Sequence, residues 1–166
     1  MAISMALILN FITIFRMPFG GSVTFGHMVP LVFFAFQNGA ISGFYIGFIY
    51  GVVKALLSFS IIPSKNIVIF VLAFLLDYII PYASVGVSYF ISKKICKSKK
   101  LILILTCVIT NIFKLMSTVV SGVFIWKEYL PSNMNLWVYS IVYNSLYVVP
   151  EALISVYLSL LLLKYL

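Results

Sequence analysis

Negative charge is what this sequence has least of. The 166 residues include 3 Asp and Glu against 11 Lys and Arg, and charged residues make up only 8% of the chain. A soluble domain carries roughly 25% charged residues and roughly 45–50% apolar ones, whereas this chain is 64% apolar. The composition excludes an ordinary soluble domain, a disordered tail and a nucleic-acid-binding domain, which needs a basic face on a polar fold. It indicates an integral membrane protein with the lipid bilayer, and no nucleic acid, as its surroundings.

Histidine and cysteine are nearly missing as well. His27, Cys96 and Cys107 are the whole set, and they are too few for a structural zinc site. Cys96 lies in a lysine-rich segment that we expect to be cytoplasmic, so no disulfide is expected. The chain has no GxxxxGK[ST] phosphate loop, no HExxH and no GxSxG. We therefore expect no metal, no cofactor and no enzymatic activity.

Long apolar runs are what the sequence has in abundance. They are continuous rather than alternating, which favours helices over a membrane barrel. The sequence predicts an all-α bundle of six transmembrane helices that forms a single integral membrane domain over residues 1–166. At 1.5 Å per residue the first run reaches about 22 Å, less than the roughly 30 Å of a bilayer core, so we expect the true N-terminus to lie a few turns upstream. The six runs cover residues 2–15, 25–36, 40–59, 67–92, 101–126 and 135–163.

Basic residues indicate the orientation of these helices. Five lysines lie close together between the fourth and fifth runs, and loops rich in Lys and Arg face the cytoplasm. With six spans, both the N- and the C-terminus are then cytoplasmic, and the segments 16–24, 60–66 and 127–134 face outward. The five are Lys93, Lys94, Lys97, Lys99 and Lys100.

Small residues recur at every fourth position in the third run. Gly39, Gly43, Gly47 and Gly51 share one helix face, and small residues let helices approach closely in lipid. Such a face either packs inside the bundle or slides against a partner protein. The small pair formed by Ala2 and Ala6 in the first run has the same two interpretations.

Four charges lie inside the predicted spans. A charge within the bilayer costs on the order of 2.5–3.5 kcal/mol on insertion scales, so each should face the bundle interior and have a partner. One interpretation is structural, with Asp77 paired to Lys114, or Glu151 to Lys54. The other is functional, with Asp77 as the counter-ion of a cationic ligand.

Aromatic residues gather near the predicted outer ends of the last two spans. An interfacial aromatic belt explains Trp137 and Tyr129 well. Tyr139 and Tyr143 are four residues apart and share a helix face near Asn144, where a flat cationic heterocycle could stack beside a carboxylate. The full set is Trp126, Tyr129, Trp137, Tyr139, Tyr143 and Tyr147.

Four segments together resemble one family, the thiamine-specific substrate-binding (S) components of energy-coupling factor transporters. They are MPFGGSV at residues 17–23, LDY at 76–78, KxxxTxxxGxxxW at 114–126, and WVYSIVYN at 137–144 followed by YVVP at 147–150. The resemblance implies a protein of the bacterial plasma membrane that captures thiamine from outside. It also implies two kinds of partner, a membrane coupling subunit and two cytoplasmic ATPases. In this superfamily a small-xxx-small motif of the first span contacts the coupling subunit, which Ala2 and Ala6 match.

The resemblance also assigns the ligand site. We expect the loop of Gly20, Gly21 and Ser22 to be the lid, because glycine lets the backbone fold tightly over a ligand. The sequence departs from the family pattern at Thr118, where members often have a histidine, and at Phe19, where a polar residue is common. Thr118 keeps a hydroxyl donor and loses the stacking ring. The implied ligand-binding residues are Asp77, Tyr78, Lys114, Thr118, Gly122, Trp126, Tyr139, Tyr143 and Asn144.

Two alternatives stay open beside thiamine uptake. The departure at Thr118 is compatible with a different small heterocyclic vitamin or with a thiamine precursor. A non-transporting membrane scaffold, held to a constitutive partner by the glycine face, is the other alternative, and it predicts that no small molecule binds.

Overall fold

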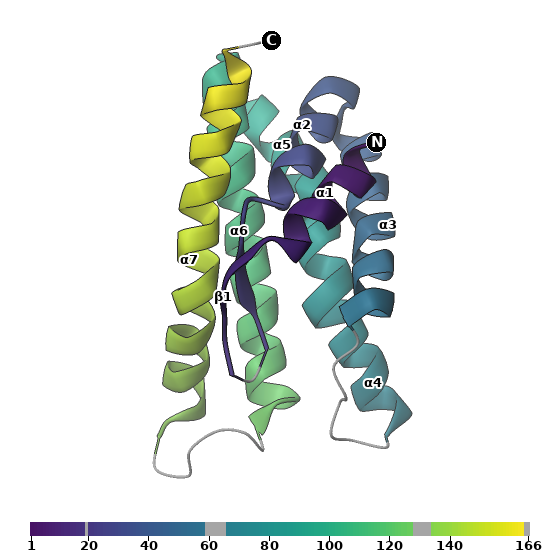
Figure 1. The fold of residues 1–166 in the computed structure, drawn as a ribbon, viewed down its shortest axis with the longest axis vertical. Coiled ribbons are helices and arrows are strands. Elements are labelled where there is room, and N and C mark those ends of the chain that lie inside the picture. Colours follow the sequence, from purple (N-terminus) through teal and green to yellow (C-terminus); the bar gives the residue numbers. More distant parts are fainter. Residues whose placement is uncertain (19, 59–65, 128–133, 165–166) are drawn as a thin grey trace.

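The computed structural model describes residues 1–18, 20–58, 66–127 and 134–164 (Figure 1). Phe19, Tyr129 and most of the predicted outer segments 60–66 and 127–134 lie outside the described residues. The helices are α1 (Ala2–Phe11), α2 (Met28–Asn38), α3 (Ala40–Ser58), α4 (Ile67–Ala73), α5 (Ile80–Ile95), α6 (Lys99–Phe124) and α7 (Leu136–Leu163), with a π-helical segment η1 (Phe74–Ile79) between α4 and α5.

Four helical segments of the described chain are long and apolar enough to cross a membrane. They are 40–57 within α3, 67–95 through α4, η1 and α5, 99–124 in α6, and 136–163 in α7. Helices α1 and α2 are apolar but shorter, with 10 and 11 residues. The prediction of a multi-pass helical membrane protein is confirmed, and the last four predicted spans coincide with these segments.

The first predicted span is wrong beyond Phe11. Helix α1 ends there, and the chain continues as strand β1 (Thr13–Arg16), which pairs antiparallel with β2 (Ser22–Thr24). β-Branched residues around Thr13 favour an extended chain. Gly20 and Gly21 close the hairpin at φ +100° and +83°, a backbone region that glycine adopts without steric cost. Within the described residues the bundle is therefore all-α apart from one small hairpin.

The glycine face of α3 is an internal packing surface. A Cβ atom at Gly47 would collide with the backbone carbonyl of Tyr82, and one at Gly51 would lie 2.6 Å from the carbonyl oxygen of Tyr78. Helices α3 and α5 therefore approach each other closely along this face. The packing interpretation is confirmed for Gly43, Gly47 and Gly51, which leave no room for a sliding partner, whereas Gly39 ends α2 and has open space around it.

Ala6 also faces inward. It is 0% exposed and belongs to the apolar core that α1 shares with Met28 and Leu31 of α2, while Ala2 packs half-buried against the same core. That Ala2 and Ala6 contact a coupling subunit stays a prediction, in which the partly exposed Ala2 would supply the contact surface.

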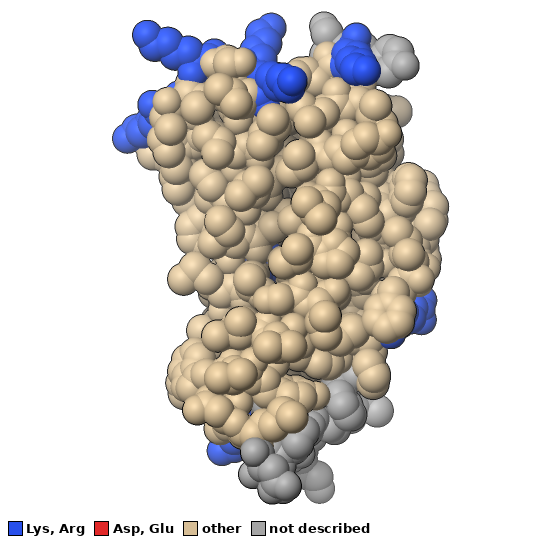
Figure 2. Space-filling model, turned by 90° about the vertical axis from the view of Figure 1, so that its left-hand side faces the viewer, with Lys and Arg blue, Asp and Glu red and all other residues tan. Residues whose placement is uncertain are grey.

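The lysine cluster marks one end of the bundle. It covers the junction where α5 ends at Ile95 and α6 begins at Lys99. Figure 1 places the C-terminus at this same upper end, and Figure 2 shows Lys and Arg side chains gathered there. The hairpin turn lies toward the opposite end of the bundle (Figure 1).

Candidate functional site

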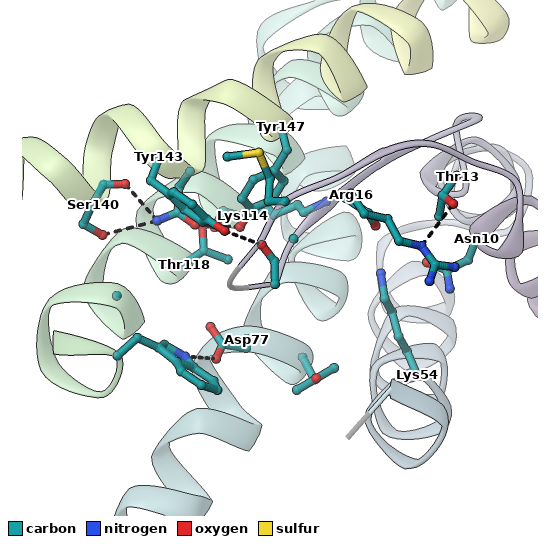
Figure 3. A pocket seen from close by; sticks show the side chains of 18 of the residues that line it. Asn10, Thr13, Arg16, Lys54, Asp77, Lys114, Thr118, Ser140, Tyr143 and Tyr147 are labelled. Carbon is teal, nitrogen blue, oxygen red and sulfur yellow. Dashed lines mark hydrogen bonds between the residues drawn. The ribbon is translucent and has the colours of Figure 1, made fainter. Parts of the chain in front are cut away.

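A cavity of about 530 Å³ lies among the hairpin, α3, η1, α6 and α7 (Figure 3). Its α6 residues, from Lys114 to Gly122, come from the C-terminal half of that helix, Trp126 follows the end of α6, and its α7 residues come from the N-terminal half. The cavity is therefore in the half of the bundle away from the lysine cluster. Its size falls within the roughly 300–1,000 Å³ of small-molecule sites.

The structure brings the predicted ligand-binding and lid residues together around this one cavity. From η1, α6 and the residues just after α6 the lining includes Asp77, Tyr78, Lys114, Thr118, Gly122 and Trp126, and from α7 and the hairpin it includes Tyr139, Tyr143, Asn144, Gly20, Gly21 and Ser22. That these residues line one cavity is a property of this structure alone and involves no comparison with related proteins. That they bind a ligand stays a prediction.

Asp77 projects from the π-helical segment. Its Oδ2 accepts a hydrogen bond from the indole Nε1 of Trp126 at 3.1 Å. π-Helical turns are rare and frequently occur at functional sites. This hydrogen bond joins η1 to the end of α6 and holds a carboxylate and a large aromatic ring at the same wall of the cavity.

The structural interpretation in which Asp77 pairs with Lys114 is wrong. Lys114 donates instead to Oε2 of Glu151, which is 0% exposed. The Thr24 hydroxyl donates to Oε1 of Glu151 at 2.6 Å, and Nδ1 of His27 lies 2.7 Å from the same oxygen. Glu151 thus joins the cavity wall to the end of β2 and the start of α2.

The suggested pair of Glu151 and Lys54 does not form either. Lys54 donates to the Tyr82 hydroxyl at 2.5 Å, and its ammonium group lies 4.9 Å from the centre of the Tyr82 ring. Lys54 and Tyr82 both line the cavity.

Polar groups of α7 form a hydrogen-bonded chain along the cavity. The Tyr147 hydroxyl donates to Oδ1 of Asn144 at 2.6 Å, and Nδ2 of Asn144 donates to the Ser140 carbonyl at 2.8 Å. Tyr139 and Tyr143 stack with ring centroids 5.9 Å apart. The arrangement fixes the amide and presents aromatic surface beside it.

Thr118 and Gly122 lie on the side of α6 that faces α7 at the cavity wall. The Thr118 hydroxyl donates to the Lys114 carbonyl at 3.0 Å, and that it offers a donor to a ligand stays a prediction. Its oxygen can still accept a hydrogen bond. A Cβ atom at Gly122 would collide with the Ser140 hydroxyl, so glycine permits the close approach of α6 and α7 here.

The hairpin turn rests on α7 beside the cavity. The Tyr143 hydroxyl donates to the Gly20 carbonyl at 2.9 Å. A Cβ atom at Gly21 would lie 2.6 Å from Cε1 of Tyr147. This contact places the predicted lid residues at the cavity.

Removing the hydroxyl that holds the hairpin should speed ligand release. We expect Tyr143→Phe to raise the dissociation rate of a bound ligand about three- to tenfold, because one hydrogen bond contributes about 0.5–1.5 kcal/mol and the aromatic ring remains. Stopped-flow measurement of the off-rate checks this. Tyr157→Phe, on the exposed side of α7, is the matched control and should change nothing. An unchanged off-rate in Tyr143→Phe would show that this bond does not hold the lid.

Sequence reasoning missed part of the cavity wall. Tyr147 continues the aromatic face of α7 four residues after Tyr143, which is a signal that could have assigned it. Asn10, Thr13 and Arg16 carried no such signal, because their place depends on the unpredicted hairpin.

A helical membrane bundle with a polar and aromatic cavity beside a glycine hairpin is typical of membrane proteins that bind small molecules. The family described as thiamine transporter protein (Thia_YuaJ) matches residues 1–166, and the chain belongs to this family. The resemblance found in the sequence is thereby confirmed, and so is the expectation of a transport protein rather than an enzyme.

Two relatives agree with this assignment. Thiamine transporter ThiT of Bacillus subtilis (strain 168) is 28% identical over 148 residues, which cover 83% of this chain and 72% of that protein. A solved structure of ThiT from Listeria monocytogenes superposes with a TM-score of 0.76 over 99% of this chain and 90% of that one. At 19% identity the second likeness shows the fold alone.

Proposed function

We propose that the cavity binds thiamine and that the chain is the substrate-binding component of an energy-coupling factor transporter for high-affinity thiamine uptake. The observation that carries the proposal is the convergence of Asp77, Trp126, Tyr139 and Asn144 on one cavity in a member of the thiamine transporter family.

The chemistry of the cavity suits this ligand. Thiamine has a permanently cationic thiazolium ring, which a carboxylate such as Asp77 and an aromatic face such as Trp126 attract. Its flat aminopyrimidine ring can stack on Tyr139, and Asn144 has an amide that can exchange its internal hydrogen bonds for ligand bonds. Lys114 is neutralised by Glu151, so this buried lysine does not add an uncompensated positive charge beside the thiazolium.

The orientation of the bundle supports a direction of transport, from outside to inside. With the lysine cluster in the cytoplasm, six spans place both termini inside and the cavity toward the outer side. Thiamine would be captured there beneath the hairpin and delivered inward by a membrane coupling subunit and two ATPases in the bacterial plasma membrane. The missing phosphate loop in this chain supports a division of labour in which the partners hydrolyse ATP.

The two alternatives are separated by ligand binding. Thr118 keeps another heterocycle or a thiamine precursor open as the ligand, because its hydroxyl donates within α6 and does not select thiamine. The scaffold alternative loses its main support, because the glycine face is occupied by α5.

Isothermal titration calorimetry on the detergent-purified protein tests the proposal. We expect saturable thiamine binding at submicromolar concentration, and at least 100-fold weaker binding of the isolated pyrimidine and thiazole fragments and of a flavin. If a fragment or the flavin binds more tightly than thiamine, that compound is the ligand and the thiamine assignment is wrong. No binding by a protein that circular dichroism shows to be folded would contradict the proposal. Co-purification with a coupling subunit and ATPases, followed by ATP-dependent uptake in vesicles, tests the transport step separately.

A further inference from the structure

A groove lies between the start of α6 and the end of α7, at the end of the bundle that carries the lysine cluster. It has a volume of about 390 Å³. Lys100 of α6 and Lys164, which directly follows α7, both line it. Figure 2 shows the Lys and Arg side chains that gather at this end. The groove shares no lining residue with the cavity beneath the hairpin, so it is a separate feature of the surface.

The charge around this groove is of one sign. The five lysines of the cluster and Lys164 all belong to this end of the chain's fold. The acidic residues that the structure describes are engaged elsewhere, since Asp77 lines the cavity and Glu151 is fully buried against Lys114. No ion pair joins any of the six lysines to a described side chain. Basic clusters at the end of membrane-crossing helices attract anionic lipid headgroups.

The rest of the groove is apolar and continues into the membrane layer. Leu160, Leu161 and Leu163 line it as half-buried side chains. Tyr157 lines it as well and is 63% exposed. It lies seven residues before Lys164, about 10 Å along the helix. These four residues belong to the part of α7 that can cross a membrane, so the groove extends from a basic end into the hydrocarbon region.

This combination of charge and apolar surface selects one kind of occupant. A second copy of the chain would bring the same lysines and a net charge of +8 against the first. A soluble acidic partner could pair with the lysines, but the apolar part of the groove lies along a membrane-crossing helix. A phospholipid with an anionic headgroup matches both parts, because its phosphate is negative and its acyl chains are apolar.

We propose that this groove binds an anionic phospholipid of the leaflet next to the lysine cluster. The phosphate lies between the ammonium groups of Lys100 and Lys164, and one acyl chain follows the leucines past Tyr157. Ammonium groups bind phosphate oxygens through charge-assisted hydrogen bonds, and the lysine stems can lie along apolar surface while their charges reach the headgroup. The inference goes beyond thiamine uptake and holds for whichever small molecule the cavity binds.

Mass spectrometry of the intact, detergent-solubilised protein tests the lipid site. The probes are phosphatidylglycerol, which is anionic, and phosphatidylcholine with the same acyl chains, which carries no net charge. We expect the wild type to bind phosphatidylglycerol at least tenfold more tightly. Lys100→Gln combined with Lys164→Gln should weaken this binding at least tenfold, because each lysine near an anionic headgroup contributes roughly a fivefold factor.

Two matched controls separate a site from general surface charge. Lys93→Gln combined with Lys94→Gln removes the same charge from the end of α5, outside the groove, and should change phosphatidylglycerol binding less than twofold. Leu161→Trp fills the groove and keeps every lysine, and it should weaken binding at least fivefold. Leu162→Trp places the same ring on the neighbouring residue, which is 47% exposed and outside the groove lining, and should have no effect. Circular dichroism checks that each variant is folded.

Three results would overturn the lipid site. One is equal binding of the two phospholipids by the wild type. Another is equal loss of phosphatidylglycerol binding in the two double lysine variants, which would assign the attraction to the charge of the whole end. The third is phosphatidylglycerol binding by folded Leu161→Trp with wild-type affinity. If the wild type retains no lipid and a coupling subunit binds it but not the Lys100 and Lys164 variant, the groove is a protein interface instead.

Discussion

Asp77→Asn is expected to weaken thiamine binding at least 100-fold without unfolding the protein. The carboxylate is the acidic side chain of the described residues that lines the cavity, and it faces the cavity from a wall shared with Trp126. Truncating one partner of a buried charge pair costs about 2–5 kcal/mol, and about 2.7 kcal/mol corresponds to a factor of 100. Asparagine keeps an oxygen that can accept the indole hydrogen bond, so the local packing is retained.

The matched control is Asn66→Asp, which changes a carboxamide to a carboxylate at the exposed start of α4, outside the cavity. It should leave affinity unchanged. Asp77→Ala should lose as much affinity as Asp77→Asn, because the missing charge is the common change. Thiamine binding by either Asp77 variant with wild-type affinity would show that the ligand site has been assigned wrongly.

Glu151→Gln is expected to destabilise the bundle and to weaken thiamine binding together. Glu151 is fully buried and neutralises Lys114 while it accepts a hydrogen bond from Thr24. Breaking a buried ion pair by removing one partner costs about 3–5 kcal/mol, because the other charge stays buried without compensation. The uncompensated Lys114 would also repel a thiazolium cation in the same cavity.

A double variant separates the charge effect from the packing effect. Lys114→Met combined with Glu151→Gln removes both charges, and it should regain much of the melting temperature lost in Glu151→Gln. It should also regain thiamine affinity, while the affinity of an uncharged pyrimidine analogue should change little in any of the three variants. A double variant as unstable and as weak in binding as Glu151→Gln would show that the ion pair is not the cause.

Much of the helical framework and most of the candidate site could be predicted from sequence. The long apolar runs give the positions of α3 to α7 because a bilayer requires continuous apolar helices. The spacing of Tyr139 and Tyr143 indicates one helix face, whereas Asn144 was assigned from the family resemblance. Asp77 was assigned because a carboxylate inside a span is costly and needs a purpose.

The errors concern the partners of the buried charges and two local elements, the π-helical segment and the hairpin. The sequence places Asp77, Lys114 and Glu151 at roughly similar depth in the membrane. It does not show which sides of their helices face one another, so spacing alone could not identify the ion pair. The π-helical segment at Phe74–Ile79 changes the local twist around Asp77, and no composition signal marked it. The hairpin was missed because four apolar or β-branched residues after Phe11 read equally well as more helix.

The most direct test of a thiamine site in this cavity is a fluorescence titration of a single-tryptophan protein. Trp126 lines the cavity, whereas Trp137 is 47% exposed, packs on Phe124 and lies outside the cavity lining, so Trp137→Phe leaves one reporter at the site. We predict saturable quenching of Trp126 by thiamine in Trp137→Phe, with no quenching in Trp126→Phe. Equal quenching of Trp137 in Trp126→Phe, or a silent Trp126 in a protein that binds thiamine by calorimetry, would contradict the site.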